Sequence, residues 1–484
     1  LLRCNVRDLI TLPGVRPQDD WRPLRAVERA WLGSEAHRLY FRNHTGPDYR
    51  TEVWLSQTFA FEECDVLVQG RLDGMTPAGS GWIVEEVKST PLRGDDLKAI
   101  RPDVSHIEQC GLYCVLAARG GEAVTGGRIV YVTLAGDDFQ PHDIEYDGAT
   151  WEALLDARLR ALIARHEEAE RLRIQRLEMA ARMEFPFPEI RPVQASLLGE
   201  AEDAARQGLS MLCSAPTGAG KTIAALYPYT RETLRENGRL FFATARISQQ
   251  ALAIETLNQL APKGAVGLGM QLRAKERSCP REVMQCLQSV CPYIRDFAGK
   301  LERSEVVKDL LEEGVVDADR IEEAALIEEL SPYELSIVLA ERMAVVVADL
   351  NYVFDPRIAL RRLLGENVYL VVDEAHNLPD RARGYYSPRM DMTRMDQLIV
   401  DCRELALFPG FGFQRPEHTV FARGAELLQT VRDEFDRMLR IFEEEQEPSP
   451  FFVERPEKEF FQELAVRLES LIAEYYLFLA GNPA

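Results

Sequence analysis

Residues Ser210–Thr222 read Ser-Met-Leu-Cys-Ser-Ala-Pro-Thr-Gly-Ala-Gly-Lys-Thr, and the fold expected for the middle of the chain follows from this stretch. A short apolar run gives way to small residues, and a helix-compatible run begins after Lys221. A strand, a glycine-bearing turn and a helix in this order predict a phosphate-binding loop. Gly218 and Gly220 let successive backbone N–H groups point inward, and the new helix adds its positive end at the same place.

The loop predicts an ATP site. Lys221 is expected to reach the β- and γ-phosphates, and the Thr222 hydroxyl is expected to bind Mg²⁺. Ala215 departs from the general pattern, because a glycine usually stands there. The loop residues expected at the nucleotide are Ala215, Pro216, Thr217, Gly218, Ala219, Gly220, Lys221 and Thr222.

The bulk composition describes an acidic, globular protein. The 484 residues are enough for roughly three domains of about 150 residues each, and 46% are hydrophobic. A formal net charge of −21 excludes a wholly basic nucleic-acid coat but leaves room for a local basic channel. We find no secretory leader and no apolar run as long as a membrane span. We therefore expect a cytoplasmic protein without a membrane partner, in which clustered cysteines bind metal rather than form disulfides.

A second motif completes the predicted ATP site. An apolar strand over 368–372 is followed by Asp373-Glu374-Ala375-His376. This strand would deliver Asp373 to the Mg²⁺ beside the phosphates, and Glu374 would orient the hydrolytic water. His376 would couple that site to bound nucleic acid.

Residues 239–246 predict a buried strand that ends in polar side chains. Ligands collect at the carboxyl ends of parallel strands, so Thr244 and Arg246 are candidates to contact a DNA backbone. The Asp-Glu-Ala-His stretch resembles superfamily 2 helicases, and the phosphate loop resembles that of the XPD/DinG branch in particular. The resemblance implies that Gln194, upstream of the loop, reads the adenine of ATP.

The first part of the chain carries a separate set of polar residues. A predicted strand over 66–74 ends near Asp73, and the next strand carries Glu86 and Lys88. Side chains two apart on a strand lie on the same face, so Glu85 points to the other face. We predict that Asp73 and Glu86 share Mg²⁺ or Mn²⁺ through their oxygens, while Lys88 orients or activates water.

A helix predicted around residues 106–113 places Gln109 and Tyr113, four residues apart, on one side. An Asp, then Glu-x-Lys, then Gln-x-x-x-Tyr resembles the PD-(D/E)XK nuclease superfamily. Gly33 and His37 on an upstream helix place the sequence near the RecB-type branch. The resemblance implies that His37 is a further metal ligand.

Three cysteines lie between the two ATP motifs: Cys279, Cys286 and Cys291. The XPD/DinG family carries a four-cysteine domain with a 4Fe-4S cluster in this part of the chain, and thiolates suit iron–sulfur clusters. Zinc fits less well, since the spacing contains no C-x-x-C pair and no nearby histidine. Ser331 stands at the fourth position, so we expect a cluster that is absent, oxidation-prone or three-iron. Cys213 is expected on the strand before the phosphate loop, in the core.

These readings divide an α/β chain into four parts. We expect a restriction-endonuclease-like α/β nuclease domain over 1–149 and a helical linker over 150–184. A RecA-like P-loop motor domain with a parallel sheet would span 185–384, with a cysteine-bearing helical insertion at about 270–340. Residues 385–484 would begin a helical arch. We find no second motor domain with arginine fingers, so we expect about the first two-thirds of a nuclease–helicase fusion.

The predicted function is that of an ATP-dependent DNA helicase–nuclease in DNA processing or repair. ATP hydrolysis would move a monomer along single-stranded or branched DNA, and the metal site would cleave the strand. The family resemblance implies 5′-to-3′ movement. Two alternatives stay open: a helicase whose nuclease fold only grips DNA, and an ATP-gated nuclease that does not translocate.

Overall fold

The structure of this chain is a computed structural model. It describes residues 1–10, 26–44, 46–216, 218–284, 286, 290–365, 367–387, 390–408, 419–444 and 458–481. These residues form two compact units. The first contains the described residues of 1–160 and 389–484, and the second those of 161–388. Each unit is described by itself below.

The first unit is built on a six-stranded mixed sheet with the order β1-β3-β4-β5-β6, in which β2 also pairs with β3. The pairs β1–β3 and β4–β5 are parallel, and the other pairs are antiparallel. The strands are β1 Leu2–Asn5, β2 Arg50–Ala60, β3 Asp65–Ala78, β4 Gly81–Thr90, β5 Val124–Thr133 and β6 Phe139–Ile144. The helices that accompany them are α1 Val6–Ile10, α2 Ala26–His44, α3 Gly94–Ala99 and α4 Val104–Arg119.

Close helix–sheet packing positions the polar residues of this unit. A Cβ on Gly70 of β3 would lie 2.8 Å from the Tyr113 ring, so α4 approaches the sheet where only glycine fits. A Cβ on Gly33 of α2 would lie 2.9 Å from Oγ of Ser89, at the end of β4. Helix α4 therefore approaches β3, and α2 approaches β4, at short range because a glycine at each contact lacks a side chain.

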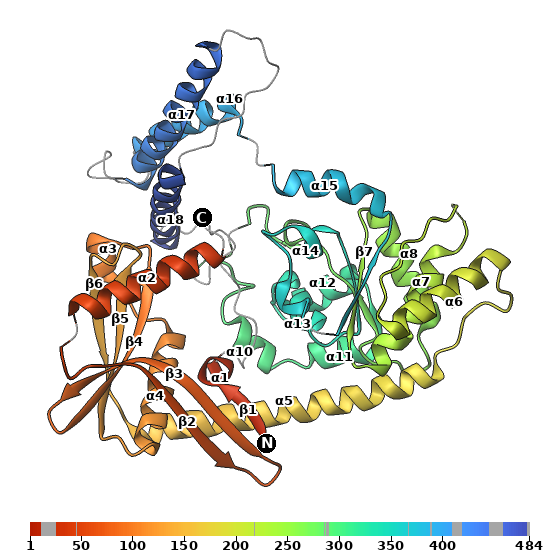
Figure 1. Cartoon of the computed structure of the whole chain (residues 1–484), viewed down its shortest axis with the longest axis horizontal. Helices are drawn as coiled ribbons and strands as arrows, with labels where there is room; N and C mark the ends of the chain where they lie inside the picture. Colours follow the sequence, from red (N-terminus) through yellow and green to blue (C-terminus); the bar gives the residue numbers. More distant parts are fainter. Residues whose placement is uncertain are drawn as a thin grey trace. The chain divides into compact units, whose positions relative to one another are not determined.

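Three further helices of the first unit are α16 Met392–Ala406, α17 Val420–Glu444 and α18 Lys458–Gly481 (Figure 1). They pack through a small apolar core that includes Met395, Ile399, Ala425 and Val431. The Ser470 hydroxyl of α18 donates a 2.7 Å hydrogen bond to the Pro91 carbonyl. This part of the chain is helical, as its sequence pattern predicts.

The second unit contains a parallel five-stranded sheet with the order β11-β7-β10-β8-β9. Its strands are β7 Arg239–Ala243, β8 Gly269–Gln271, β9 Val315–Val316, β10 Val345–Ala348 and β11 Val368–Val372. The longer helices are α6 Pro192–Gln207, α7 Lys221–Arg235, α8 Ile247–Leu260, α12 Ala318–Ile327, α13 Pro332–Ala340 and α15 Leu378–Tyr385. Shorter ones are α9 Lys275–Ser278, α10 Phe297–Glu302, α11 Val306–Glu312 and α14 Asn351–Phe354, with 3₁₀ turns η1 Arg361–Leu363 and η2 Ala375–Asn377.

Helices cover both faces of this sheet. Leu240 and Phe242 of β7 pack in one core with residues of α7 and α8, whereas Phe241 packs in another with residues of α11, α12 and α13. Alternate side chains of a strand point to opposite faces, so each face needs its own apolar layer. Figure 1 shows this sheet between its two helix layers. The α/β class predicted from the sequence is confirmed.

Helix α5 runs without a break from Gly148 to Arg182, which confirms the prediction of one long helix there. Met179 and Ala180 near its end belong to the apolar core beneath α7 and α8. None of the helices in the described part of the chain has the length and apolar character needed to cross a lipid bilayer.

The strand predicted just before the phosphate loop is not formed. Residues 209–216 have no regular secondary structure, and Leu212 is 95% exposed. The prediction that Cys213 lies in the core is therefore wrong, because this side chain is exposed. A strand is stable only when a neighbour satisfies its N–H and C=O groups. Among the described residues, β11 at the sheet edge pairs only with β7, and no strand lies beside 209–216.

Candidate ATP and metal sites

The phosphate loop folds against its own lysine. Gly218 and Gly220 have φ angles of 80° and 77°, a left-handed conformation that glycine adopts without a Cβ clash. Helix α7 begins directly afterwards at Lys221, whose Nζ donates a 3.0 Å hydrogen bond to the Ala215 carbonyl. The lysine thus occupies the turn of the loop, where a phosphate chain would lie.

The other loop residues have different surroundings. Thr222 lies in the first turn of α7 and is half-buried. The backbone N–H of Ala219 donates to the Pro216 carbonyl at 3.3 Å and closes the turn. Thr217 lies outside the described residues.

Gln194, on the first turn of α6, lies beside this loop. A Cβ on Gly220 would be 2.6 Å from Nε2 of Gln194, so the amide packs directly on the glycine. Arg191, which precedes α6, donates from Nη1 to the Gly218 carbonyl at 2.9 Å. Sequence reasoning missed Arg191. Arg191 directly precedes α6 and lies three residues before Gln194, and this spacing was the signal that could have identified it. In the structure the Arg191 backbone N–H donates to Oε1 of Gln194.

Asp373 follows β11 at the carboxyl edge of the sheet. Burial raises the pKa of its carboxyl above the usual range, the negative charge of Glu374 raises it further, and the positive charge of Lys221 opposes both. The phosphate-loop lysine and this acid therefore interact across the sheet edge. A Mg²⁺–triphosphate needs a cationic side chain for the phosphates and a carboxylate for the metal ion, and Lys221 and Asp373 are groups of these two types.

Both carboxylate oxygens of Glu374 are held in place. Nε2 of Gln249 lies 3.3 Å from Oε1, and Nδ1 of His376 lies 3.2 Å from Oε2. Gln249, on the first turn of α8, also accepts a 2.5 Å hydrogen bond from the Thr244 hydroxyl. This network joins the ends of β7 and β11. Sequence reasoning missed Gln249, whose role depends on strands that are neighbours only in the folded sheet.

The two candidate DNA contacts differ in exposure. Thr244 is fully buried and its hydroxyl points to Gln249, whereas Arg246 is exposed at the start of α8. Of the two, Arg246 presents its charge to solvent.

A second polar cluster lies on β3, β4 and α4 of the first unit. Lys88 donates from Nζ to Oε1 of Glu86 at 2.6 Å and to Oε1 of Gln109 at 2.8 Å. Asp73 accepts from the Val87 backbone N–H at 2.8 Å, which fixes one carboxylate oxygen beside Glu86. The residues predicted from two strands and a helix therefore converge.

Glu86 is almost completely buried, and its Oε2 atom has no hydrogen-bond partner. Burial, with a smaller contribution from the charge of Asp73, raises the pKa of its carboxyl to about 7. Lys88 opposes this shift. A buried carboxylate oxygen without a partner costs free energy, and a bound cation would satisfy it.

His37 lies within electrostatic range of the same cluster. Burial lowers the pKa of its imidazole, Asp73 raises it, and Lys88 and Arg7 lower it further. A neutral imidazole is the form that binds metal. Arg7 also lowers the pKa of Glu86, so α1 contributes a positive charge that sequence reasoning missed.

Tyr113 and Glu85 lie next to this cluster, and their hydrogen bonds go to other residues as well. The Tyr113 hydroxyl donates to the Arg71 carbonyl at 3.2 Å, and its side chain hydrogen-bonds Gln109. Glu85 instead bonds Tyr49, Thr76 and Arg128, at 2.9, 2.9 and 3.2 Å. Both oxygens of Glu85 are thus engaged away from Lys88.

The cysteine region is only partly brought together. The Ser331 backbone N–H donates to the Tyr293 carbonyl at 2.9 Å, which places it beside the Cys291-Pro292-Tyr293 stretch. Its hydroxyl accepts from the Glu334 N–H and caps α13. Cys291 is buried, whereas Cys279 and Cys286 are half-buried.

The described residues contain no group of three or more His, Cys, Asp or Glu side chains arranged to hold a metal ion. This finding applies to the described cysteines and equally to His37, Asp73 and Glu86. Asp73 and Glu86 are two oxygen ligands in kind, and the unpartnered Oε2 of Glu86 fits a divalent cation that completes its shell with water.

Comparison with known proteins bears on the second unit. Residues 242–395 match the DEAD_2 family. The matched range includes Gln249, Asp373 and Glu374, and it begins after the phosphate loop. This match supports the predicted relationship to XPD-type helicases and suggests an ATP-dependent enzyme that acts on DNA. No curated protein matches the chain.

Two of the solved structures to which the chain is similar illustrate the range of the matches. One is described as "Truncated XPD", with 16% identity, a TM-score of 0.32, and coverage of 58% of this chain and 81% of that one. The other is described as "Crystal structure of SSO0001", with 21% identity, a TM-score of 0.22, and coverage of 33% and 76%.

Proposed function

We propose that this protein is an ATP-dependent DNA helicase of the XPD type that carries a metal-dependent nuclease. The observation that carries the helicase proposal is the electrostatic interaction of Lys221 with Asp373, which follows β11 and is itself followed by Glu374. The DEAD_2 match over residues 242–395 supports it. The unpartnered Glu86 oxygen beside Lys88 supports the nuclease proposal.

At the ATP site, each residue has a defined task. Phosphate binding would exchange the hydrogen bond between Lys221 and Ala215 for contacts to the β- and γ-phosphates. The Thr222 hydroxyl and the Asp373 carboxylate would hold Mg²⁺, which neutralises charge that develops on the phosphates. Glu374, clamped by Gln249 and His376, would orient the attacking water. Gln194 would contact the adenine.

Bound DNA would influence the ATP site through the residues that follow β7. Arg246 would contact the DNA backbone as an exposed cation, and Thr244 would act through Gln249. Such backbone contacts depend on charge and weaken with salt. Movement in the 5′-to-3′ direction on single-stranded or branched DNA belongs to this proposal.

Substitution of Lys221 by Ala tests the motor. We expect Lys221→Ala to abolish unwinding of partial duplexes with a 5′ overhang, while Lys263→Ala, which removes an exposed lysine of the same unit, leaves it intact. Unwinding that survives Lys221→Ala would overturn the motor proposal. Unwinding that requires a 3′ overhang would overturn the polarity.

At the nuclease site, Asp73 and Glu86 would hold Mg²⁺ or Mn²⁺. The cation would polarise the scissile phosphate and supply activated water. Lys88, held between Glu86 and Gln109, would orient that water and stabilise negative charge on the phosphate. His37, nearby and kept neutral by burial, would add a third ligand.

Two alternative functions predict different outcomes. End-labelled single-stranded, duplex and flapped DNA would be incubated with Mg²⁺ or Mn²⁺, with and without ATP. A protein whose nuclease fold only grips DNA would cut none of these substrates. An ATP-gated nuclease would cut only with ATP and show no directional unwinding.

An iron–sulfur cluster does not enter these steps. The Ser331 hydroxyl already caps α13, and the described cysteines form no metal group. We propose that Cys279, Cys286 and Cys291 belong to a 4Fe-4S site that the serine compromises, and iron analysis tests this below.

A further inference from the structure

A pocket of about 470 Å³ lies in the second unit, at the amino ends of the strands. Its lining includes Arg239 at the start of β7, Val368 at the start of β11 and Arg342 shortly before β10. Residues of α5 close one side. The phosphate loop belongs to the opposite, carboxyl edge, where Asp373 follows β11. The pocket is therefore separate from the ATP site described above.

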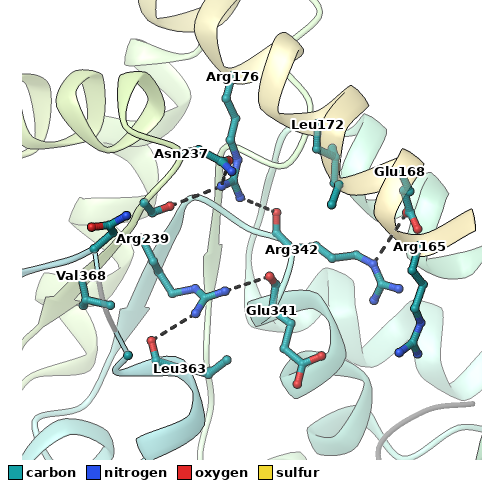
Figure 2. Close-up of a pocket in the computed structure, with 14 residues that line it drawn as sticks. Arg165, Glu168, Leu172, Arg176, Asn237, Arg239, Glu341, Arg342, Leu363 and Val368 are labelled. Carbon is teal, nitrogen blue, oxygen red and sulfur yellow. Dashed lines mark hydrogen bonds and ion pairs between the residues drawn. The ribbon is translucent and has the colours of Figure 1, made fainter. Parts of the chain in front are cut away.

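The pocket concentrates positive charge in a chain that is acidic overall. Its lining contains four arginines, Arg165, Arg176, Arg239 and Arg342, and two glutamates, Glu168 and Glu341. Figure 2 shows these side chains gathered from α5 and from the loops that precede the strands. The surplus of positive charge predicts an anionic ligand.

Two of the arginines, the buried Arg176 and the half-buried Arg239, donate hydrogen bonds only to neutral groups. Arg176 is 8% exposed and donates to Asn237 at 2.9 Å and to the carbonyls of Gly238 and Arg342 at 3.3 and 2.9 Å. Arg239 donates to the Leu363 and Glu341 carbonyls at 3.1 and 2.8 Å. In the described part of the chain, neither guanidinium has a carboxylate within ion-pair distance.

This arrangement is costly unless an anion completes it. Burial, together with the nearby charge of Arg239, lowers the pKa of Arg176 to about 10. Burial also lowers the pKa of Arg239, and the negative charge of Glu341 opposes that shift. Nε of Arg239 is buried and has no hydrogen-bond partner. A buried charge without an ionic partner destabilises a fold. A ligand with negative oxygens would offset this cost.

The other two arginines are partly or fully exposed to solvent, Arg342 being half-buried and Arg165 exposed. Nε of Arg342 lies 3.7 Å from Oε1 of Glu168, a long contact that leaves donors available. Arg165 is exposed and makes no hydrogen bond or ion pair with any described residue. In Figure 2 its side chain extends past Glu168 without a dashed contact.

We propose that this pocket binds the phosphate group of a nucleotide-sized ligand. Guanidinium groups present a planar fork that matches two phosphate oxygens, and arginine is favoured for such contacts. The volume falls within the range of about 300–1,000 Å³ usual for small-molecule sites. Leu172, Leu363 and Val368 in the lining offer apolar contacts for a base or sugar. The phosphate belongs either to a free nucleoside polyphosphate or to the 5′ end of a DNA strand.

The test uses the full chain with Lys221→Ala, in EDTA, so that neither the phosphate loop nor a metal site dominates. Calorimetric titration with inorganic pyrophosphate and with ATP is expected to show saturable binding. Arg165→Ala combined with Arg342→Ala should weaken it at least tenfold. Arg171→Ala, which removes an exposed arginine of α5 outside the pocket lining, should leave it unchanged.

A second measurement separates the two phosphate sources. Fluorescence anisotropy would compare a 5′-phosphorylated with a 5′-hydroxyl oligonucleotide. Preference for the phosphorylated strand, lost in the double variant, assigns the pocket to DNA ends, whereas binding of ATP alone assigns it to free nucleotide. Either result supports the proposal.

Because Arg176 holds backbone carbonyls together, Arg176→Lys rather than Arg176→Ala would test the buried end, with folding checked by circular dichroism. The proposal is overturned if no probe binds, or if binding is the same in the double variant and in Arg171→Ala.

Discussion

The Nζ atom of Lys88 lies 2.6 Å from one carboxylate oxygen of Glu86, while the other oxygen of Glu86 is buried without a partner. Only one of the two carboxylate oxygens of Glu86 therefore has a hydrogen-bond donor. Lys88 also donates to Gln109, so one ammonium group links β4 to α4. This geometry leads to the first two predictions.

Substitution of Lys88 by Ala should reduce DNA cleavage about 100-fold or more, because a positioned group of this kind contributes roughly 10²–10⁴ in rate. ATP hydrolysis should be unchanged, since Lys88 lies in the other unit. Cleavage of end-labelled single-stranded DNA with Mn²⁺ measures the effect. Lys98→Ala, which removes an exposed lysine of α3, is the control. Equal cleavage by both variants would reject the catalytic role.

Glu86 should make metal-free stability depend on pH. Its folded pKa is raised to about 7 from 4.5, so its contribution to stability is full below about pH 4.5 and is lost as pH rises through about 7. Glu86→Gln should therefore raise the thermal midpoint at pH 8 in EDTA, relative to the parent, more than at pH 5. Thermal unfolding followed by circular dichroism measures the difference.

Glu85→Gln provides the matched control for this experiment, because Glu85 is the adjacent residue and equally buried. Its oxygens accept from Tyr49, Thr76 and Arg128, so the amide would lose acceptors and destabilise the fold. Stabilisation by Glu85→Gln, or none by Glu86→Gln at pH 8, would contradict the assignment of the buried charge to Glu86.

Substitution of Gln249 by Ala should lower kcat for ATP hydrolysis about tenfold with little change in KM. The amide holds Glu374 at 3.3 Å but makes no hydrogen bond to the described residues of the phosphate loop, and loss of one hydrogen bond to a charged group costs about 1.5 kcal/mol. Steady-state ATPase assays with DNA give both constants. Ser248→Ala, at the exposed neighbouring position, should match the parent. A change confined to KM in Gln249→Ala would refute a positioning role.

Ser331→Cys should increase the iron and sulfide bound after anaerobic purification. The new thiol would lie at the position beside the Cys291-Pro292-Tyr293 stretch. Loss of the hydroxyl cap of α13 should cost about 1 kcal/mol of stability in the metal-free protein. Iron assays with visible absorption spectra measure binding, and Ser336→Cys on the same helix is the control. If neither parent nor Ser331→Cys holds iron, the cluster hypothesis fails.

Spacing along the chain predicted much of both candidate sites. Alternation on β4 separated Glu86 and Lys88 from Glu85 before any contact was known, because the strand repeat is two residues. The unbroken helical pattern predicted α5 in the same way. Residues such as Lys221, Thr222, Asp373 and Glu374 were identifiable because the segment that carries the chemistry also forms the local turn.

Contacts between distant segments could not be predicted in this way. Gln249 meets Glu374 only because β7 and β11 are neighbours in the sheet, and Arg7 reaches Glu86 only through the packing of α1. The strand predicted before the phosphate loop failed for the related reason that a strand needs a paired neighbour. The sequence by itself determined which residue types stand at each turn and strand end, since these depend on local backbone geometry. Tertiary structure alone decided the arginine pocket and the clamp on Glu374, since these depend on which elements pack side by side.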